Sequence, residues 1–208
     1  MLLKSEQPLL VAFCGPNGAG KSTLRRITLA DAGIPFVNAD DIAAREFGEQ
    51  APAHAYEAAQ IAESVRAALF VVRKSFSFET VLSDPVGEKV QFLREARDAG
   101  YFVVVHFVGL DSAERSRARV IQRVHAGGHD VPDDKLAARF PRTLENLRRL
   151  LDVPDDLVIY DNSSSDAPYR VIARLSRGGL LEIASVIPAW AQPLELSARK
   201  SADTKLVP

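Results

Sequence analysis

One short segment carries the clearest chemistry in the sequence: Gly15-Pro16-Asn17-Gly18-Ala19-Gly20-Lys21-Ser22. It has the spacing of a phosphate-binding glycine loop, and it stands between an apolar run, Leu9 to Phe13, and a helical pattern starting at Thr23. In such a loop, backbone N–H groups surround the β-phosphate, Lys21 neutralises the β/γ oxygens and Ser22 can hold Mg²⁺. The match in this setting disfavours an ordinary glycine turn. We therefore predict that this segment, with Thr23, binds a nucleoside triphosphate, and we expect ATP with Mg²⁺.

Carboxylates follow the next two predicted strands. Asp40 and Asp41 follow the strand Pro35 to Asn38, and Glu79 lies near the end of the third strand. In an open parallel sheet these strand ends border the ligand crevice, where an acid can accept a proton from a substrate hydroxyl. Helix capping is the alternative for the aspartates, so we assign Asp41 to the cap and Asp40 to catalysis. Glu79 could be an incidental strand-end residue, but we favour a role for it in holding Mg²⁺ or, with Thr80, substrate.

Basic residues recur at helical spacing in two later segments that a glycine hinge joins. The first face carries Arg115, Arg119 and Arg123, and the second carries Lys135, Arg139, Arg142 and Arg149. Two solvated faces are one interpretation. The other is a helical lid whose charges close over the transferring phosphoryl group and exclude water. The spacing leaves both open. His125 and His129 flank the hinge and are too sparse for a metal site.

Strands and helices alternate along the chain, which is typical of a parallel α/β sheet covered on both faces. We predict the P-loop NTPase fold, with a mostly parallel sheet of five or six strands, flanking helices and a helical, arginine-bearing lid. Tyr101 to Val108 is apolar enough for a central strand. A helix from Pro52 to Val72 should bury one apolar face, made of Ala58, Ile61, Ala62, Val65, Leu69 and Val72.

Further expectations concern where elements begin and end. Asp84-Pro85 should cap and open a helix, and Pro141 should kink or break the helix that begins at Asp133. Tyr169 to Arg177 is expected to be helical, and Leu180 to Ile187 to be the last strand. We place one kinase domain at residues 1–190, with the lid at about 112–150, and expect residues 191–208 to form a loose tail.

Composition limits the classes of protein to which the chain can belong. A chain of 208 residues, 47% of them hydrophobic, can bury a substantial core. The formal net charge of −1 gives no general attraction to nucleic acid or anionic membranes, and we expect neither as a partner. The single Cys14 cannot form an internal disulfide, which suits a reducing cytoplasm, and we expect it to be a buried, unreactive thiol. The N-terminal apolar run is too short for a signal peptide or membrane span.

Taken together, the motifs resemble those of the zeta-toxin-like P-loop kinases, especially a short bacterial group. The resemblance spans roughly residues 9 to 165, and its ordered set is more specific than the glycine loop alone. After the glycine loop, the matching pieces are Asn38-Ala39-Asp40, Phe78-Glu79-Thr80, Arg123-Val124, Gly127-Gly128-His129-Asp130-Val131-Pro132, Arg139-Phe140, Arg142, Asn146-Leu147 and Tyr160-Asp161-Asn162.

The resemblance implies transfer of the γ-phosphate of ATP, with Mg²⁺, to a hydroxyl of a small molecule. In the characterised toxins that molecule is a UDP-activated amino sugar. Asp40 matches the family's catalytic base, Arg123 its first lid arginine and Glu79 the region that holds metal or sugar. We assign Arg119 and Asn162 to nucleotide binding on the same basis.

Two departures from the family pattern concern the acceptor side. Where the larger toxins have a second lid arginine, this chain has His129, so Arg139 or Arg142 could replace that arginine. Where they have a threonine and an arginine after the Glu79 position, this chain has Val81-Leu82-Ser83. Both departures bear more on the identity of the acceptor than on phosphoryl transfer.

Three functions are compatible with these motifs. The first is a small-molecule kinase in which Asp40 deprotonates the acceptor and Lys21, Arg123 and Arg139 or Arg142 balance the charge. The second is a transporter-type ATPase or nucleotide-gated switch, which carries a similar glycine loop. That class also needs a Leu-Ser-Gly-Gly-type signature and an apolar run ending in Asp-Glu, and the sequence contains neither. The third is the toxin half of a toxin–antitoxin pair, whose protein antitoxin would cover the ATP crevice.

Overall fold

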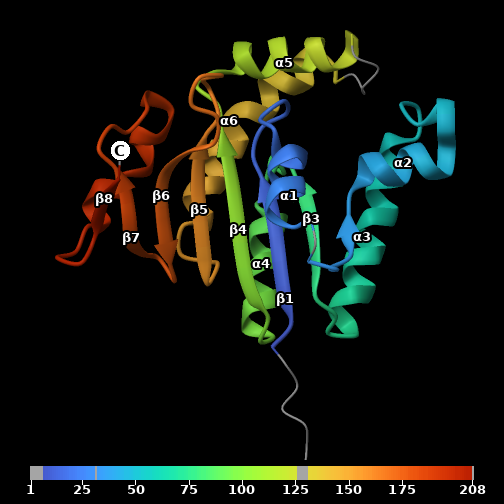
Figure 1. Ribbon diagram of the computed structural model, residues 1–208. Coiled ribbons are helices and arrows are strands. Elements are labelled where there is room, and N and C mark those ends of the chain that lie inside the picture. The colour runs from blue at the N-terminus through green and yellow to red at the C-terminus, as the bar shows by residue number, and fades with distance from the viewer. Residues whose placement is uncertain (1–6, 31, 126–130, 208) are drawn as a thin grey trace, which may run out of the picture.

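The structure, a computed structural model, describes residues 7–30, 32–125 and 131–207, and its strands form one sheet in the order β2-β3-β1-β4-β5-β6-β7-β8 (Figure 1). Neighbouring strands are parallel from β2 to β5, β6 and β7 each run antiparallel to the strand before, and β8 is parallel to β7. The strands are β1 (Leu9–Cys14), β2 (Phe36–Val37), β3 (Phe76–Thr80), β4 (Phe102–Gly109), β5 (Asp156–Asp161), β6 (Arg170–Ser176), β7 (Gly179–Ala184) and β8 (Lys205–Val207).

Helices cover both faces of this sheet. The α-helices are α1 (Lys21–Thr28), α2 (Ala39–Phe47), α3 (Ala55–Val71), α4 (Glu88–Asp98), α5 (Ala113–His125) and α6 (Asp133–Leu150), and the 3₁₀ turns are η1 (Gly48–Gln50), η2 (Ala189–Leu194) and η3 (Leu196–Arg199). Apolar residues of α3, α4 and α6 pack on one face, and α1 packs on the other. Helix α5 lies across the carboxyl ends of the central strands (Figure 1). The expected α/β fold is confirmed.

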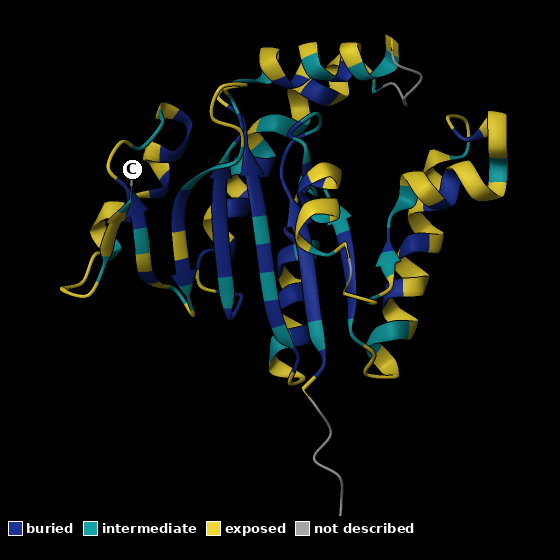
Figure 2. Cartoon of the chain, viewed as in Figure 1, coloured by how far each residue is buried: buried dark blue, intermediate teal, exposed yellow. Residues whose placement is uncertain are grey.

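The core lies around the central strands because their residues are apolar on both faces. Strand β1 is buried along nearly its whole length (Figure 2), and Phe76, Phe78 and Phe107 are fully buried. Parallel strands covered by helices on both sides require such continuous apolar runs. The carboxyl ends of β1, β2, β3 and β4 therefore meet at one edge of a rigid sheet. None of the described helices is both long enough and apolar enough to cross a membrane.

The sheet has eight strands instead of the expected five or six, because one expected helix is strand β6 and the C-terminal segment adds β8. Residues 170–176, predicted to be helical, form β6, which pairs with β5 and turns into β7 through Arg177 and Gly178. Both turn residues have positive φ, 48° and 79°, as a tight hairpin of the favoured twist requires. The apolar positions Val171, Ile172 and Leu175 fit a helix by spacing, but strand pairing determines the structure here.

The C-terminal segment, expected to be loose, packs onto the sheet. The Trp190 ring covers Gly109, where an added Cβ would meet ring carbons at 2.3 Å, and the indole N–H donates to Asp161 Oδ1 at 3.3 Å. Ala191, Leu194 and Leu196 are buried, and residues 205–207 pair with β7 as β8. The expectation of a loose tail from residue 191 is therefore wrong.

Two helix boundaries also differ from expectation. Helix α4 begins at Glu88 after Gly87, and the carboxylate of Asp84 accepts a hydrogen bond from the Glu88 N–H instead of opening the helix with Pro85. Helix α6 runs unbroken through Pro141. Pro141 lies on the exposed side of that helix, where solvent can satisfy a carbonyl that the proline leaves without a partner.

Candidate active site

The glycine loop connects β1 to α1 and needs its glycines for close backbone approach. An added Cβ on Gly15 would lie 2.1 Å from the Val108 carbonyl oxygen of β4. Gly20, with φ of 95°, caps α1, and the first turn of that helix has no acidic residue and no side-chain cap. The N–H groups and partial positive charge of this helix end therefore face the loop without competition, as anion binding requires. The residues predicted to bind phosphate thus lie around the start of α1.

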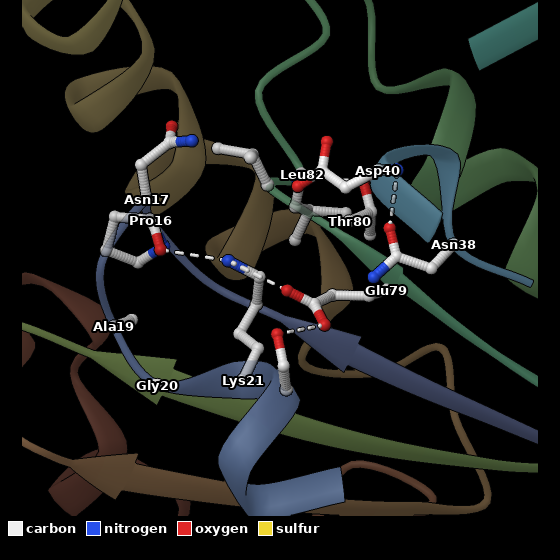
Figure 3. A network of polar contacts seen from close by, with 12 residues as sticks. Pro16, Asn17, Ala19, Gly20, Lys21, Asn38, Asp40, Glu79, Thr80 and Leu82 are labelled. Atoms are coloured by element: carbon white, nitrogen blue, oxygen red, sulfur yellow. Dashed lines mark hydrogen bonds and ion pairs between the residues drawn. The ribbon is translucent and has the colours of Figure 1, made fainter. Parts of the chain in front are cut away.

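Lys21 is held at the bottom of this loop. Its side chain is 6% exposed, and its Nζ donates to the Pro16 carbonyl at 3.0 Å and lies 3.7 Å from Glu79 Oε1 (Figure 3). Burial lowers the pKa of Lys21, while the Glu79 carboxylate opposes that shift and Arg123 adds to it. The ammonium is thus positioned before any phosphate arrives, and Glu79 compensates its charge.

Ser22 and Glu79 place two oxygens beside the loop. The Ser22 hydroxyl donates to Glu79 Oε2 at 2.8 Å, and Glu79 comes from the end of β3. Among the described residues no group of three or more His, Cys, Asp or Glu could hold a metal ion. Mg²⁺ in phosphate sites is held by one or two protein ligands together with substrate oxygens, so this pair fits such an ion. The predicted metal residues are brought together.

Asp40 lies across the cleft, at the start of α2. The Asn38 side chain accepts a hydrogen bond from the Asp40 N–H at 2.9 Å and caps the helix, so our assignment of the cap to Asp41 is wrong. Asp40 and Asp41 both lie in the exposed first turn. The Asp40 charge reaches Lys21, whose pKa it raises slightly against the effect of burial. Figure 3 shows Asp40 near the end of β3, the strand that carries Glu79 and Thr80.

A cleft of about 300 Å³ lies between α1, α2 and α5, and its walls include basic residues that the sequence analysis missed. Its lining consists of Ser22, Arg25, Arg26, Phe36, Asn38, Asp40, Asp41 and Arg123. The Arg25 guanidinium lies 4.1 Å from the centroid of the Phe36 ring, an arrangement typical of cation–π contacts. Arg25 and Arg26 lie four and five residues after Lys21, in the last turn of the short helix that follows the loop, and that position could have indicated them.

Helix α5 is the first helix of the expected lid, and it places two of its three predicted arginines, Arg119 and Arg123, at the site. Arg123 lines the cleft, and Arg119 packs so close to the glycine loop that its Cβ would lie 2.9 Å from an added Cβ on Gly18. The Ser116 hydroxyl donates to the Asn17 carbonyl at 2.7 Å and joins α5 to the loop. Arg115 instead forms a two-pronged pair with Asp111, at 2.6 and 2.8 Å, so it lies on a solvated face.

The second lid helix contributes less to the cleft than its spacing indicated. Arg139 and Arg142 are half-buried on α6, and within the described part of the chain neither side chain forms a hydrogen bond or ion pair with Lys21, Glu79 or Asp40. Arg149 pairs with Glu145 along its own helix at 3.5 Å. The two helices are joined instead by Arg117 and Asp133, at 2.7 Å. His129 lies outside the described residues.

Asn162 and Tyr169 hold the glycine loop from the side of β5 and β6. The Asn162 amide donates to the Ala19 carbonyl at 2.8 Å, and the Tyr169 hydroxyl donates to the Gly20 carbonyl at 2.9 Å. The Asn162 side chain also accepts from the Tyr169 N–H at 3.2 Å. Asn162 therefore supports the backbone of the loop. Tyr169 was missed because its segment was expected to be helical.

The loop after β3 is fixed by α6. Asn146 donates to the carbonyls of Leu82 and Asp84, at 3.0 and 2.8 Å, and the Thr143 hydroxyl donates to the Val81 carbonyl at 2.9 Å. The Thr80 hydroxyl accepts from the Leu82 N–H at 3.1 Å. Thr80 thus shapes the turn after Glu79, and its expected part in substrate binding stays a prediction.

The buried thiol and one histidine have structural roles at this site. Burial raises the pKa of the Cys14 thiol to about 12, consistent with the expected unreactive cysteine. His106 stacks on Phe13 with ring centroids 5.1 Å apart and lies 3.1 Å from the Tyr160 hydroxyl, and burial lowers its pKa to about 4. His106 is therefore neutral beneath the loop at physiological pH.

Comparison with known families resolves what kind of phosphate site this is. The family model described as Zeta toxin matches residues 2–171, which is most of the chain and includes every predicted site residue. The chain belongs to the zeta toxin family. The resemblance first seen in the glycine loop, Asn38-Ala39-Asp40 and Phe78-Glu79-Thr80 is confirmed.

Related proteins agree with this zeta toxin assignment. An uncharacterized protein of Haemophilus influenzae is 30% identical over 133 residues, which are 62% of this chain and 91% of that protein. The PezAT toxin–antitoxin structure of Streptococcus pneumoniae is similar with a TM-score of 0.59 and 19% identity, covering 83% of this chain and 72% of that one. AvrRxo1-ORF1:AvrRxo1-ORF2 is similar with a TM-score of 0.71 and 17% identity, covering 94% and 66%. At these identities the two structures show the shared fold.

Proposed function

We propose that the protein is an ATP-dependent kinase that transfers the γ-phosphate to a hydroxyl of a small molecule. The observation that carries this proposal is the arrangement of Lys21, Ser22 and Glu79 at a glycine loop, with Asp40 and Arg123 lining the cleft beside them. Lys21, Ser22 and Glu79 suit a triphosphate donor. Asp40 offers a base and Arg123 a cation for an acceptor. Membership of the zeta toxin family supports the same reaction.

Each residue has a distinct part in the proposed reaction. Asp40 accepts the proton of the acceptor hydroxyl as that oxygen attacks the γ-phosphorus; a new O–P bond forms, the bond to the bridging oxygen of ADP breaks, and ADP leaves. Lys21 and Arg123 stabilise the phosphoryl oxygens, and Arg139 or Arg142 adds charge when the lid closes. Ser22 and Glu79 are the residues that would hold Mg²⁺, which when bound neutralises phosphate charge. Because phosphoryl transfer requires little covalent chemistry from the protein, catalysis comes mainly from positioning the substrates and from electrostatic stabilisation.

The acceptor side favours an anionic substrate. Arg25, Arg26 and Arg123 line the cleft together with Asp40 and Asp41, so three cations surround the proposed base. Arginine side chains recognise phosphate through paired hydrogen bonds, and Arg25 keeps a buried Nε without a hydrogen-bond partner among the described residues. A UDP-activated amino sugar or another nucleotide-linked metabolite carries both the hydroxyl and the phosphates that such a cleft would recognise. His129 is proposed to bind the same substrate.

A protein antitoxin is a further proposed partner. The similar PezAT structure is titled as a toxin–antitoxin system, and AvrRxo1-ORF1 is a complex with ORF2. An antitoxin that inhibits this chain would have to cover the cleft at α2 and α5.

The test uses the purified protein with γ-labelled ATP and Mg²⁺. A UDP-activated amino sugar is supplied first, then an extract of small metabolites, and products are identified by mass spectrometry. We expect the label in a new phosphate ester. Phosphorylation of a different hydroxyl compound would correct the acceptor alone, whereas release of the label only as inorganic phosphate would overturn the kinase proposal and favour the transporter-type ATPase or switch.

A further inference from the structure

A second cavity lies between α3 and α4, outside the phosphate cleft. Its volume is about 660 Å³, within the range of cavities that hold small metabolites. Arg66 and Ala67 of α3 form one wall, Phe92 of α4 and Val86 before it contribute apolar surface, and Glu63 and Lys89 also line it. None of its described lining residues belongs to the phosphate cleft. The two helices flank β3 on the same face of the sheet (Figure 1).

Arg66 is the unusual group in this cavity. It is 9% exposed, and its guanidinium lies 5.4 Å from the centroid of the Phe78 ring. Among the described residues, no hydrogen bond or ion pair of Arg66 is present beside this ring contact. Burial lowers the pKa of Arg66, but an arginine stays charged at neutral pH. None of its nitrogens is among the described buried atoms that lack a hydrogen-bond partner, so its N–H donors reach the solvent of the cavity, where an anion would accept hydrogen bonds from them.

Two of the three acidic residues that line the cavity have partners other than Arg66. Glu63 pairs with Lys89 at 3.4 Å, and Glu95 accepts from the Gln91 amide at 3.0 Å. Glu88 is exposed at the start of α4. Glu63 is near enough to raise the pKa of Arg66, yet it forms its ion pair with the lysine. The fork of Arg66 therefore remains available to a ligand.

We propose that this cavity is a second ligand site, which binds a small molecule carrying a carboxylate or phosphate on an apolar body. The anionic group would pair with Arg66, because its planar fork matches the two oxygens of either group. The apolar body would lie against Phe92, Val86 and Ala67. Phe78 and Glu79 are consecutive in β3 and point to opposite faces of the sheet, so the second site lies on the opposite side from Lys21.

Binding of 4-fluorobenzoate and of phenylphosphonate, followed by ¹⁹F NMR and calorimetry, tests this proposal and distinguishes carboxylate from phosphate recognition. Lys21→Met, which removes the cation of the glycine loop, and Arg94→Met, on the exposed side of α4, are the controls. We expect at least one probe to bind the wild type and both controls equally, and to bind Arg66→Met at least about tenfold more weakly. Arg66→Lys, which keeps the charge, should show a smaller loss and serves if Arg66→Met does not fold.

Three results would overturn the proposal. One is equal affinity of Arg66→Met and the wild type for both probes. Another is loss of binding in Lys21→Met, which would place the anion in the glycine loop. The third is the absence of binding of either probe to the wild type. None of these results depends on whether the protein transfers phosphate, so failure here is distinguishable from failure of the kinase proposal.

Discussion

The two halves of the phosphate cleft are built differently. On the donor side, Lys21 is buried, and the backbone of the glycine loop is held by Ser116 of α5 and by Asn162 and Tyr169 of the loop between β5 and β6. On the acceptor side, Asp40 stands exposed on the first turn of α2, which follows the two-residue strand β2. The Asn38 cap is the hydrogen bond that holds its N–H.

This difference follows from the two ligands that we propose for the site, a triphosphate donor and a specific acceptor. A triphosphate donor is shared by many kinases, and a loop fixed in advance binds it without paying the entropy of ordering. The acceptor side carries the proposed base, Asp40, on an exposed first helical turn after a two-residue strand, and such exposed segments tolerate substitution more readily. We infer that the donor half sets the reaction and the acceptor half sets the substrate.

The largest expected effect concerns the acceptor half. Asp40→Asn should lower kcat for phosphoryl transfer by about 10²–10⁴-fold, because general base catalysis supplies that range. The KM for ATP should stay within about twofold, since the donor half is untouched. Asp41→Asn, the adjacent carboxylate in the same cleft, is the matched control and should change kcat little. Transfer at the wild-type rate by Asp40→Asn would show that the base is elsewhere.

The Glu79→Gln substitution tests the proposed role of Glu79 in holding Mg²⁺. Its carboxylate accepts from Ser22 and compensates the buried Lys21, so we expect the Mg²⁺ concentration for half-maximal activity to rise about 10–100-fold. The exposed Glu49 provides a control, Glu49→Gln, with no expected change. The readout is a Mg²⁺ titration at saturating ATP. An unchanged Mg²⁺ requirement would remove Glu79 from the metal assignment.

Tyr169→Phe tests whether the donor half is preorganised. It removes one hydrogen bond to the Gly20 carbonyl, worth about 1 kcal/mol, so KM for ATP should rise about fivefold while KM for the acceptor is unchanged. Tyr56→Phe, on an exposed position of α3, is the control. Steady-state kinetics with each substrate varied in turn measure the KM for ATP and the KM for the acceptor. Equal increases in both KM values would indicate a general loss of structure instead.

The His106 prediction concerns the stability of the fold beneath the donor half and not the reaction. Its pKa is about 4 in the fold and about 6.5 unfolded, so between these values the unfolded chain binds a proton that the folded chain does not. The free energy of unfolding should therefore fall as pH decreases from 6.5 to 4, by roughly 3 kcal/mol at most from this group. His106→Gln should lose that part of the pH dependence in urea unfolding, and the exposed His125→Gln should keep it. Identical pH profiles for His106→Gln and the wild type would contradict this assignment.

The sequence predicted the donor half well because its signals are local. The glycine loop, the strand before it and the helix after it are consecutive, and Asp40 and Glu79 follow strand ends that a parallel sheet brings together. Periodicity alone misassigned β6, whose identity depends on the hairpin turn at Arg177 and Gly178. The Arg177-Gly178-Gly179 turn signal was present in the sequence but was interpreted as a helix end.

Other features depend on contacts between residues far apart in the chain. The C-terminal segment is ordered because Trp190 fits over Gly109, and no local pattern indicates such a partner. Helix α3 shows the opposite error: Ile61 and Val65 of its predicted buried face are 37% and 38% exposed. How much of a helix is buried depends on which other elements pack against it, and the sequence of the helix alone does not show this.

The fate of the γ-phosphate tests the central claim most directly. The wild type, Asp40→Asn and Lys21→Met are each given γ-labelled ATP, Mg²⁺ and the acceptor mixture, and the label is divided between phosphate ester and inorganic phosphate. We predict that the wild type places the label in an ester, that Asp40→Asn binds ATP normally but forms little ester, and that Lys21→Met forms little ester and binds ATP weakly. Label appearing only in inorganic phosphate with the wild type would contradict the account.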